Sequence, residues 1–234
     1  MKSVVKSFLI TSVFALLLAT TASADSLVID PVGDFLPTYA GPRAGDLDVV
    51  TTQFTLSGSN FQFAGTMNGA VGTTPGAFYV FGINRGAGTA RFGTIMNATT
   101  GAIYNANGVL FDSVVVIQNG TVTVRDLTPG GLNTTLPSEN LTIMGNTLSV
   151  LVPASLLPSR GLAFDQYTFN LWPRFAGVDG NTQISDFAPD NRNAQVSAVP
   201  EPTTLLLLGT GLAGVVARVR RRRKARCANE AAAA

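Results

Sequence analysis

The chain has no histidine, a single cysteine and few charged residues. Asp, Glu, Lys and Arg together make up 13% of its 234 residues, and the one cysteine is Cys227. Without histidine there is no Ser-His-Asp or Cys-His nucleophile and no imidazole-ligated zinc or haem. A single cysteine allows no disulfide within the chain and no CxxC metal site. The commonest catalytic and redox arrangements are therefore excluded.

Residues 1–24 have the three parts of a secretory signal peptide. Lys2 and Lys6 form a basic region, an apolar run covers 8–19, and Ala22-Ser23-Ala24 is a small-x-small cleavage site. An uncleaved membrane anchor is the alternative, but the apolar run is much shorter than the ~20 residues that a spanning helix needs. We predict cleavage by signal peptidase after Ala24.

The last forty residues combine a proline motif, an apolar segment and a basic cluster. Val199-Pro200-Glu201-Pro202 precedes the apolar residues 203–217. The basic residues that follow are Arg218, Arg220, Arg221, Arg222, Arg223, Lys224 and Arg226. Fifteen helical residues rise only ~22 Å, so we expect one short transmembrane helix that spans a ~30 Å layer by thinning it or by snorkelling arginines. The basic cluster stays cytoplasmic, which places the preceding chain outside.

The order of Pro-Glu-Pro, short apolar helix and arginine cluster resembles the PEP-CTERM sorting signal of Gram-negative bacteria. The resemblance covers residues 199 to about 226. It implies a transient membrane anchor and recognition by exosortase, a membrane transpeptidase-like enzyme. It also implies a secreted or cell-surface location in organisms that make exopolysaccharide and biofilm matrix. A basic block beside an apolar helix is typical of a stop-transfer flank, so we expect no nucleic-acid partner.

These assignments divide the chain into a signal peptide (1–24), a β-domain (25–195), a sorting signal (196–226) and a tail (227–234). From Asp25 to Ala198 there are seven arginines, no lysine and twelve acidic residues, a net charge of −5, whereas the whole chain has +2. The exported domain is therefore mildly acidic, and the basic balance of the whole chain carries no information about an anionic partner.

Period-two alternation dominates the β-domain. In 50–56, hydrophobic and polar residues alternate, and Phe61 and Phe63 repeat the pattern. Runs at 78–83, 114–117 and 148–152 are apolar on both faces, as in strands buried between layers, and alternation returns at 167–171. We therefore predict strands at each of these positions.

Turn signals separate these strands. Asn119-Gly120 predicts a tight hairpin, and Gly145-Asn146 predicts a second one. Only 153–158 has the pattern of a helical turn, and 69–76, 86–93 and 128–140 are expected to be long loops. The predicted fold is all-β, an antiparallel β-sandwich or jelly roll of eight to eleven short strands.

Four aspartates near the start of the β-domain are candidate metal ligands. They are Asp30, Asp34, Asp46 and Asp48, in the contexts Asp-Pro-Val-Gly-Asp and Gly-Asp-Leu-Asp. Carboxylates gathered from two loops require a cation such as Ca²⁺, although Asp and Gly are also ordinary turn residues. A later acidic stretch, Asp186 to Asp190, is positioned to supply one more ligand.

The β-domain resembles calcium-containing carbohydrate-binding modules in three respects. These are the early DxxGD, a later Asp-Leu at the start of a strand, and the spacing of the predicted strands. This resemblance implies a structural Ca²⁺ and a polysaccharide ligand. Sugar sites use aromatic platforms, for which Trp172 is the main candidate, with Tyr39, Tyr79, Tyr104 and Tyr167 behind it. A core position for Trp172 is the alternative, and the sequence alone favours it.

The sequence favours a non-enzymatic, exported matrix component associated with exopolysaccharide. A calcium-stabilised carbohydrate-binding module is the alternative. A glycoside hydrolase that uses two carboxylates is a third hypothesis, for which no pair of acids stands out.

Overall fold

The computed structural model describes residues 27–198. The predicted signal peptide with Ala22 and Ala24, the Pro-Glu-Pro motif, the apolar helix and the arginine cluster lie outside the described residues. Among residues 27–198, no helix is long and apolar enough to cross a membrane. Every helical element in that range is a 3₁₀ turn of three or four residues. These are η1 (Gly45–Leu47), η2 (Ser138–Asn140), η3 (Ala154–Leu156), η4 (Phe164–Gln166) and η5 (Gly180–Gln183).

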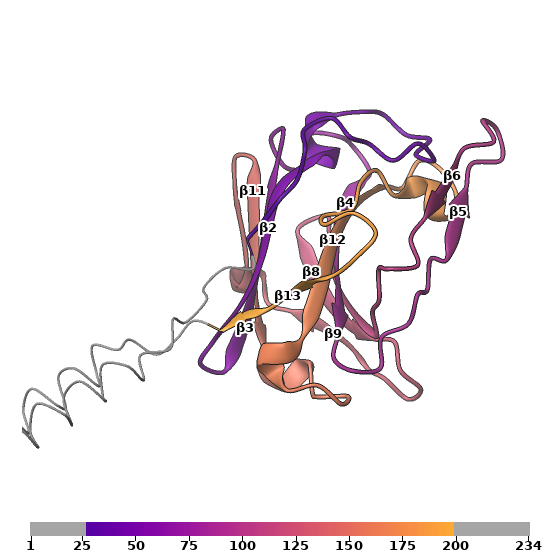
Figure 1. Ribbon diagram of the computed structural model, residues 1–234. Coiled ribbons are helices and arrows are strands. Elements are labelled where there is room, and N and C mark those ends of the chain that lie inside the picture. Colours follow the sequence, from indigo (N-terminus) through magenta and orange to yellow (C-terminus); the bar gives the residue numbers. More distant parts are fainter. Residues whose placement is uncertain (1–26, 199–234) are drawn as a thin grey trace, which may run out of the picture. The chain divides into compact units, whose positions relative to one another are not determined.

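Two six-stranded sheets form the domain (Figure 1). The first has the order β1 (Val28–Ile29), β2 (Val49–Ser57), β3 (Asn60–Met67), β11 (Thr147–Pro153) and β10 (Leu141–Met144), with β14 (Ser197–Ala198) parallel to β2. The second has the order β13 (Ala194–Gln195), β12 (Thr168–Phe175), β4 (Ala77–Asn84), β7 (Ser113–Gln118), β8 (Thr121–Asp126) and β9 (Asn133–Leu136). A separate hairpin pairs β5 (Thr94–Met96) with β6 (Ile103–Asn105). The all-β, predominantly antiparallel sandwich predicted from the sequence is confirmed.

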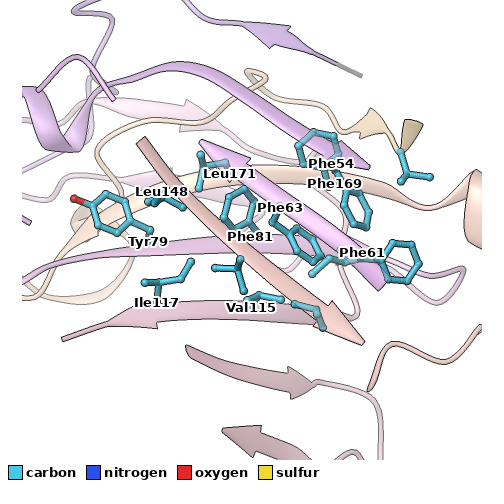
Figure 2. Close-up of a cluster of buried hydrophobic side chains, with 14 of the residues drawn as sticks. Phe54, Phe61, Phe63, Tyr79, Phe81, Val115, Ile117, Leu148, Phe169 and Leu171 are labelled. Carbon is cyan, nitrogen blue, oxygen red and sulfur yellow. The ribbon is translucent and has the colours of Figure 1, made fainter. Parts of the chain in front are cut away.

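The main core fills the space between the two sheets (Figure 2). Phe54, Phe61 and Phe63 from the first sheet meet Phe81 and Phe169 from the second, and all five are fully buried. Phe54 stacks on Phe63 with ring centroids 4.3 Å apart, and it makes a T-shaped contact with Phe169 at 5.3 Å. Aromatic pairs in these geometries contribute beyond their buried area, so this cluster joins the two layers.

Alternation predicts the inward faces well except at the start of β2. There the register with β3 shifts between Val49 and Thr51, and Val49 rather than Val50 is the buried residue. Such a bulge inserts an extra residue, so the side chains before it point to the opposite face of the sheet from the one that alternation predicts. The backbone of Val49 is thereby free to bond elsewhere, as described below.

Both predicted hairpins are present. Asn119 has φ 51° and Gly120 has φ 72°, the positive values that a type I′ turn requires between β7 and β8. Gly145, at φ 61°, lies in the turn from β10 to β11. The predicted helical turn is η3. One loop prediction is wrong, because 128–140 contains β9 and η2: Asn133 to Leu136 pair with the edge of β8.

A second hydrophobic cluster covers the face of the second sheet that points away from the first. The segment between β4 and β7 (85–112) crosses this face and carries the β5–β6 hairpin, which Figure 1 shows at the far side of β4 from β2. Trp172, Phe111 and Phe187 are buried there. The domain therefore has two apolar layers, one between the sheets and one beneath the crossover.

Both ends of the domain lie on β2. Val28 pairs with Thr52 and Ser197 pairs with Thr55, both on the edge of β2 opposite β3. The final segment passes from the second sheet, where Ala194 pairs with Phe169, to the first, with Val196 buried between.

Candidate metal centre

Asp30 and Asp34 are placed by a short turn that follows β1. The amide of Asp30 donates to the carbonyl of Val50 at 2.9 Å, which holds this segment against β2. Gly33 has φ 84°, a conformation suited to glycine, and its amide donates to both carboxylate oxygens of Asp48 at 3.0 Å. The turn is therefore fixed by Asp48, and the Asp30 and Asp34 carboxylates remain available.

Asp186 reaches the same place from the other end of the domain. Its segment runs beside β12, where Leu171 and Ala188 exchange backbone hydrogen bonds. One Asp186 carboxylate oxygen accepts the amide of Val49 at 2.9 Å, and the other accepts the amide of Phe187 at 2.8 Å. The bulge in β2 and the C-terminal segment together position this carboxylate.

Asp30, Asp34 and Asp186 form a compact cluster of carboxylates. One oxygen from each lies within 4.8 Å of the others. Asp30 is 6% exposed and Asp186 is fully buried, while Asp34 is half-buried. Oδ2 of Asp30 and Oδ1 of Asp34 are buried and have no hydrogen-bond partner among the described residues. The cluster therefore has two unused acceptors in a largely dry place.

Among residues 27–198, no positive side chain forms an ion pair with the cluster. Within residues 27–198 the ion pairs join Arg85 to Asp112 and Asp126, and Arg160 to Asp126. Burial raises the pKa of Asp30 to about 7. The negative charges of Asp34, Asp190 and Asp48 act in the same direction, and a side-chain hydrogen bond with Asp186 acts against them. Burial and the charge of Asp30 raise the pKa of Asp186 to about 9, and burial raises that of Asp34. These carboxylates are costly to ionise together in the metal-free protein.

The arrangement has the chemistry of a hard-cation site. Ca²⁺ binds oxygen ligands at about 2.3–2.6 Å, so two of its ligands are at most about 5 Å apart. The three oxygens within 4.8 Å satisfy that condition. The donor set is all carboxylate, which favours Ca²⁺, Mg²⁺ or Mn²⁺ over softer metals.

Only part of the four-aspartate group predicted from sequence comes together in this cluster. Asp46 accepts the amide of Thr74 at 2.8 Å and its hydroxyl at 2.6 Å, which anchors the loop after β3. Asp48 accepts Gly33 and the side chain of Asn68 at 3.0 Å. Both carboxylates therefore hold loops. Asp186, from the later acidic stretch 186–190, forms the cluster with Asp30 and Asp34.

Trp172 is not an exposed platform. It is 1% exposed and packs against Phe92 and Phe111, each with ring centroids 5.1 Å away. The alternative core position is therefore the observed one. Tyr39, Tyr79 and Tyr167 are also buried, and Tyr104 is half-buried with its hydroxyl donating to Asp190 at 3.1 Å.

Comparison with known proteins identifies one segment of the chain. The model of the PEP-CTERM protein-sorting motif matches residues 198–222. No curated protein gives a significant match. The match begins at the last residue of β14, so the sorting motif follows directly from the edge of the first sheet. The chain therefore carries a PEP-CTERM protein-sorting motif, which marks it as an exported surface protein sorted by exosortase.

Proposed function

We propose that this protein is a non-enzymatic component of an exopolysaccharide or biofilm matrix, and that a Ca²⁺ ion bound by Asp30, Asp34 and Asp186 stabilises its β-sandwich. The sorting motif supports the extracellular part of this proposal. The carboxylate cluster supports the calcium part.

The observation that carries the proposal is the pair of unpartnered, buried oxygens on Asp30 and Asp34. A buried carboxylate without a partner costs several kcal/mol, and neighbouring negative charge adds to that cost. A divalent cation removes both costs because it neutralises the charge and uses the free lone pairs. The remaining ligands that Ca²⁺ requires would come from water or backbone carbonyls.

The same geometry argues against glycosidase chemistry at this cluster. The two carboxyl groups of a glycosidase flank a scissile bond, with about 5–10 Å between them for sugar or water. Here three carboxylate oxygens lie within 4.8 Å, and the Asp186 side chain is fully buried. A polysaccharide chain has no access to Asp186.

Thermal unfolding with and without calcium tests the proposal. The full-length chain in a sugar-free detergent is heated in chelator, in excess Ca²⁺ and in excess Mg²⁺, and the loss of β-structure is followed by circular dichroism. A ligand present at 100 times its dissociation constant adds about 2.7 kcal/mol, which for a domain of this size raises the midpoint by about 5–10 °C. Identical midpoints in Ca²⁺ and in chelator would overturn the calcium proposal.

A further inference from the structure

A pocket opens on the face of the second sheet that points away from the first. Its volume is about 350 Å³, at the lower end of the ~300–1,000 Å³ range of small-molecule sites. None of the cluster residues Asp30, Asp34 and Asp186 lines it. The lining comes from β4, β7, β8, β12 and the crossover segment. It consists of Phe78, Val80, Phe92, Phe111, Val114, Val116, Gln118, Arg125, Trp172 and Arg174.

The strand register explains the apolar floor. Trp172 pairs with Val80, and Val80 pairs with Val116, so these three side chains form one row across β12, β4 and β7. The next row places Arg174 opposite Phe78. Inward neighbours such as Phe81 belong to the core between the sheets, so alternation directs this set to the opposite face.

The crossover segment covers only part of this face. Phe92 meets the Trp172 ring edge-on, and Phe111 lies beside both rings. Phe78, Phe92 and Val116 stay half-buried, and Gln118 is exposed. The pocket therefore has an aromatic and aliphatic floor and an open, polar rim.

The charges of the pocket are of one sign. Arg125 and Arg174 line it, and no acidic residue does, although the domain as a whole has a net charge of −5. Neither arginine takes part in the ion pairs found within residues 27–198. Arg174 lies over the Phe78 ring at 5.7 Å and donates from Nη2 to the carbonyl of Gly180 at 2.8 Å, while its buried Nε has no partner.

Trp172 adds a second unsatisfied donor. Its indole Nε1 is buried without a hydrogen-bond partner, although buried tryptophans usually find one. Around this pocket lie two arginines and two buried donors that have no counter-ion and no acceptor, respectively, in the part of the chain that the structure describes. All of these groups favour a ligand that brings oxygen acceptors and negative charge.

We propose that this pocket binds a uronic-acid unit of an acidic polysaccharide. The apolar C–H face of the sugar ring would pack on the valine and aromatic floor, and its carboxylate would pair with Arg125 and Arg174. The exposed rim at Gln118 and Arg125 leaves room for the polymer to continue into solvent. This inference rests on the proposed function in one respect, since the proposed matrix is the source of the polysaccharide. It does not depend on the calcium site.

Fluorescence of the one tryptophan in the chain reads the pocket directly. The full-length chain in a sugar-free detergent is titrated with digalacturonate, and with galactobiose, which differs from it by having no carboxylates. Acetate at equal ionic strength measures the binding of a carboxylate that has no sugar ring. Monomeric galacturonate measures the binding of a single sugar acid, for comparison with the disaccharide. We expect a saturable change in Trp172 fluorescence with digalacturonate, and at least about tenfold weaker binding of galactobiose and acetate.

Two matched variants locate the binding. R125Q removes an exposed arginine of the pocket, and R192Q removes an exposed arginine outside its lining. We expect R125Q to weaken digalacturonate binding about tenfold and R192Q to leave it within twofold. V116F, which fills the pocket, should abolish the signal. Equal affinities of R125Q and R192Q, or equal binding of digalacturonate and galactobiose, would overturn the proposal.

The titrations are run in chelator, well below the calcium-free unfolding midpoint. Loss of digalacturonate binding together with an intact calcium effect on stability would reject the sugar site and leave the proposed calcium function standing. If digalacturonate binds but calcium has no effect on stability, the calcium proposal is rejected and the sugar site stands. An unchanged unfolding midpoint in R125Q confirms that its loss of binding is not a loss of fold.

Discussion

Gly82 provides the space that the Trp172 ring occupies. A Cβ atom on Gly82 would overlap Cη2 and Cζ3 of Trp172, and it would come within 3.3 Å of Phe111. The residue at this position of β4 must therefore have no side chain if the tryptophan ring is to lie over it.

We expect G82A to destabilise the domain by about 1–3 kcal/mol, the usual cost of overpacking a filled core. The midpoint of urea unfolding measures this, and the fluorescence of Trp172 reports the displaced ring. W172F replaces the indole with a smaller ring, which removes the atoms that a Cβ on residue 82 would overlap. The double variant G82A/W172F should therefore lose less stability than the sum of the losses of the two single variants. Strict additivity would show that the two residues are not coupled.

D186N should remove the calcium response. It keeps one acceptor for the backbone but removes the charge of the most buried carboxylate in the cluster. We expect the 5–10 °C rise in the unfolding midpoint with Ca²⁺ to fall to near zero. D46N is the matched control, because Asp46 is equally buried but bonds to Thr74. It should lower the midpoint in chelator and keep the calcium response, and a lost response in D46N would argue against the proposed ligand set.

Without metal, the domain should become less stable as pH rises from about 5 to 9. The pKa of Asp30 is raised to about 7 and that of Asp186 to about 9, so in this range the folded state binds more protons than the unfolded state. The contribution of these two carboxyl groups to stability is therefore greatest below their ordinary pKa of 3.8 and is lost as pH rises to the folded-state values. Urea midpoints in chelator at pH 5, 7 and 9 measure the trend, and saturating Ca²⁺ should flatten it. A midpoint that rises with pH in chelator contradicts the prediction.

D112N should destabilise the domain by about 3–5 kcal/mol, as is usual when a buried ion pair is broken. Arg85 is fully buried, and its Nε donates to Asp112 at 2.6 Å while Nη2 donates to Asp126 at 2.8 Å. R160Q removes a partner of Asp126 that is 39% exposed, so it should cost at most about 1 kcal/mol. Equal losses in urea unfolding would show that burial does not set the strength of these pairs.

Substitution of Pro200, Glu201 or Pro202 by alanine should leave the β-domain folded and keep the chain in the membrane fraction. The matched sorting motif contains all three residues, whereas every strand between 27 and 198 precedes them. Fractionation of the producing bacterium measures release, and protease resistance of the domain checks its fold. Normal release of all three variants would refute their role in sorting.

The local parts of the fold follow from sequence because their signals are local. Alternation sets the inward faces of β2 and β3, and Asn119-Gly120 has the one turn chemistry that joins β7 to β8. The two-residue strands β1, β13 and β14 carry no periodic signal, since they form only where a longer strand offers its edge. β9 was not predicted for the same reason, since it is short and forms on the edge of β8.

The candidate sites depend on contacts between distant residues. Asp46 and Asp48 follow Asp34 by 12 and 14 residues, but hydrogen bonds from Thr74 and Gly33 occupy their carboxylates. Asp186 joins Asp30 only because the C-terminal segment returns beside β12. Trp172 is buried because the crossover segment covers one face of the second sheet. The sequence favoured a core position for this residue but did not indicate which segment covers it.

The hydrogen bond from Val49 to Asp186 joins residues 137 positions apart. Synthesis supplies the N-terminal part of a chain first, so Asp30 and Asp34 exist long before Asp186 is added. The carboxylate cluster can therefore close only when nearly the whole domain is present. An ion held there would distinguish a completed domain from a truncated or half-folded one, immediately before the segment that the sorting machinery recognises.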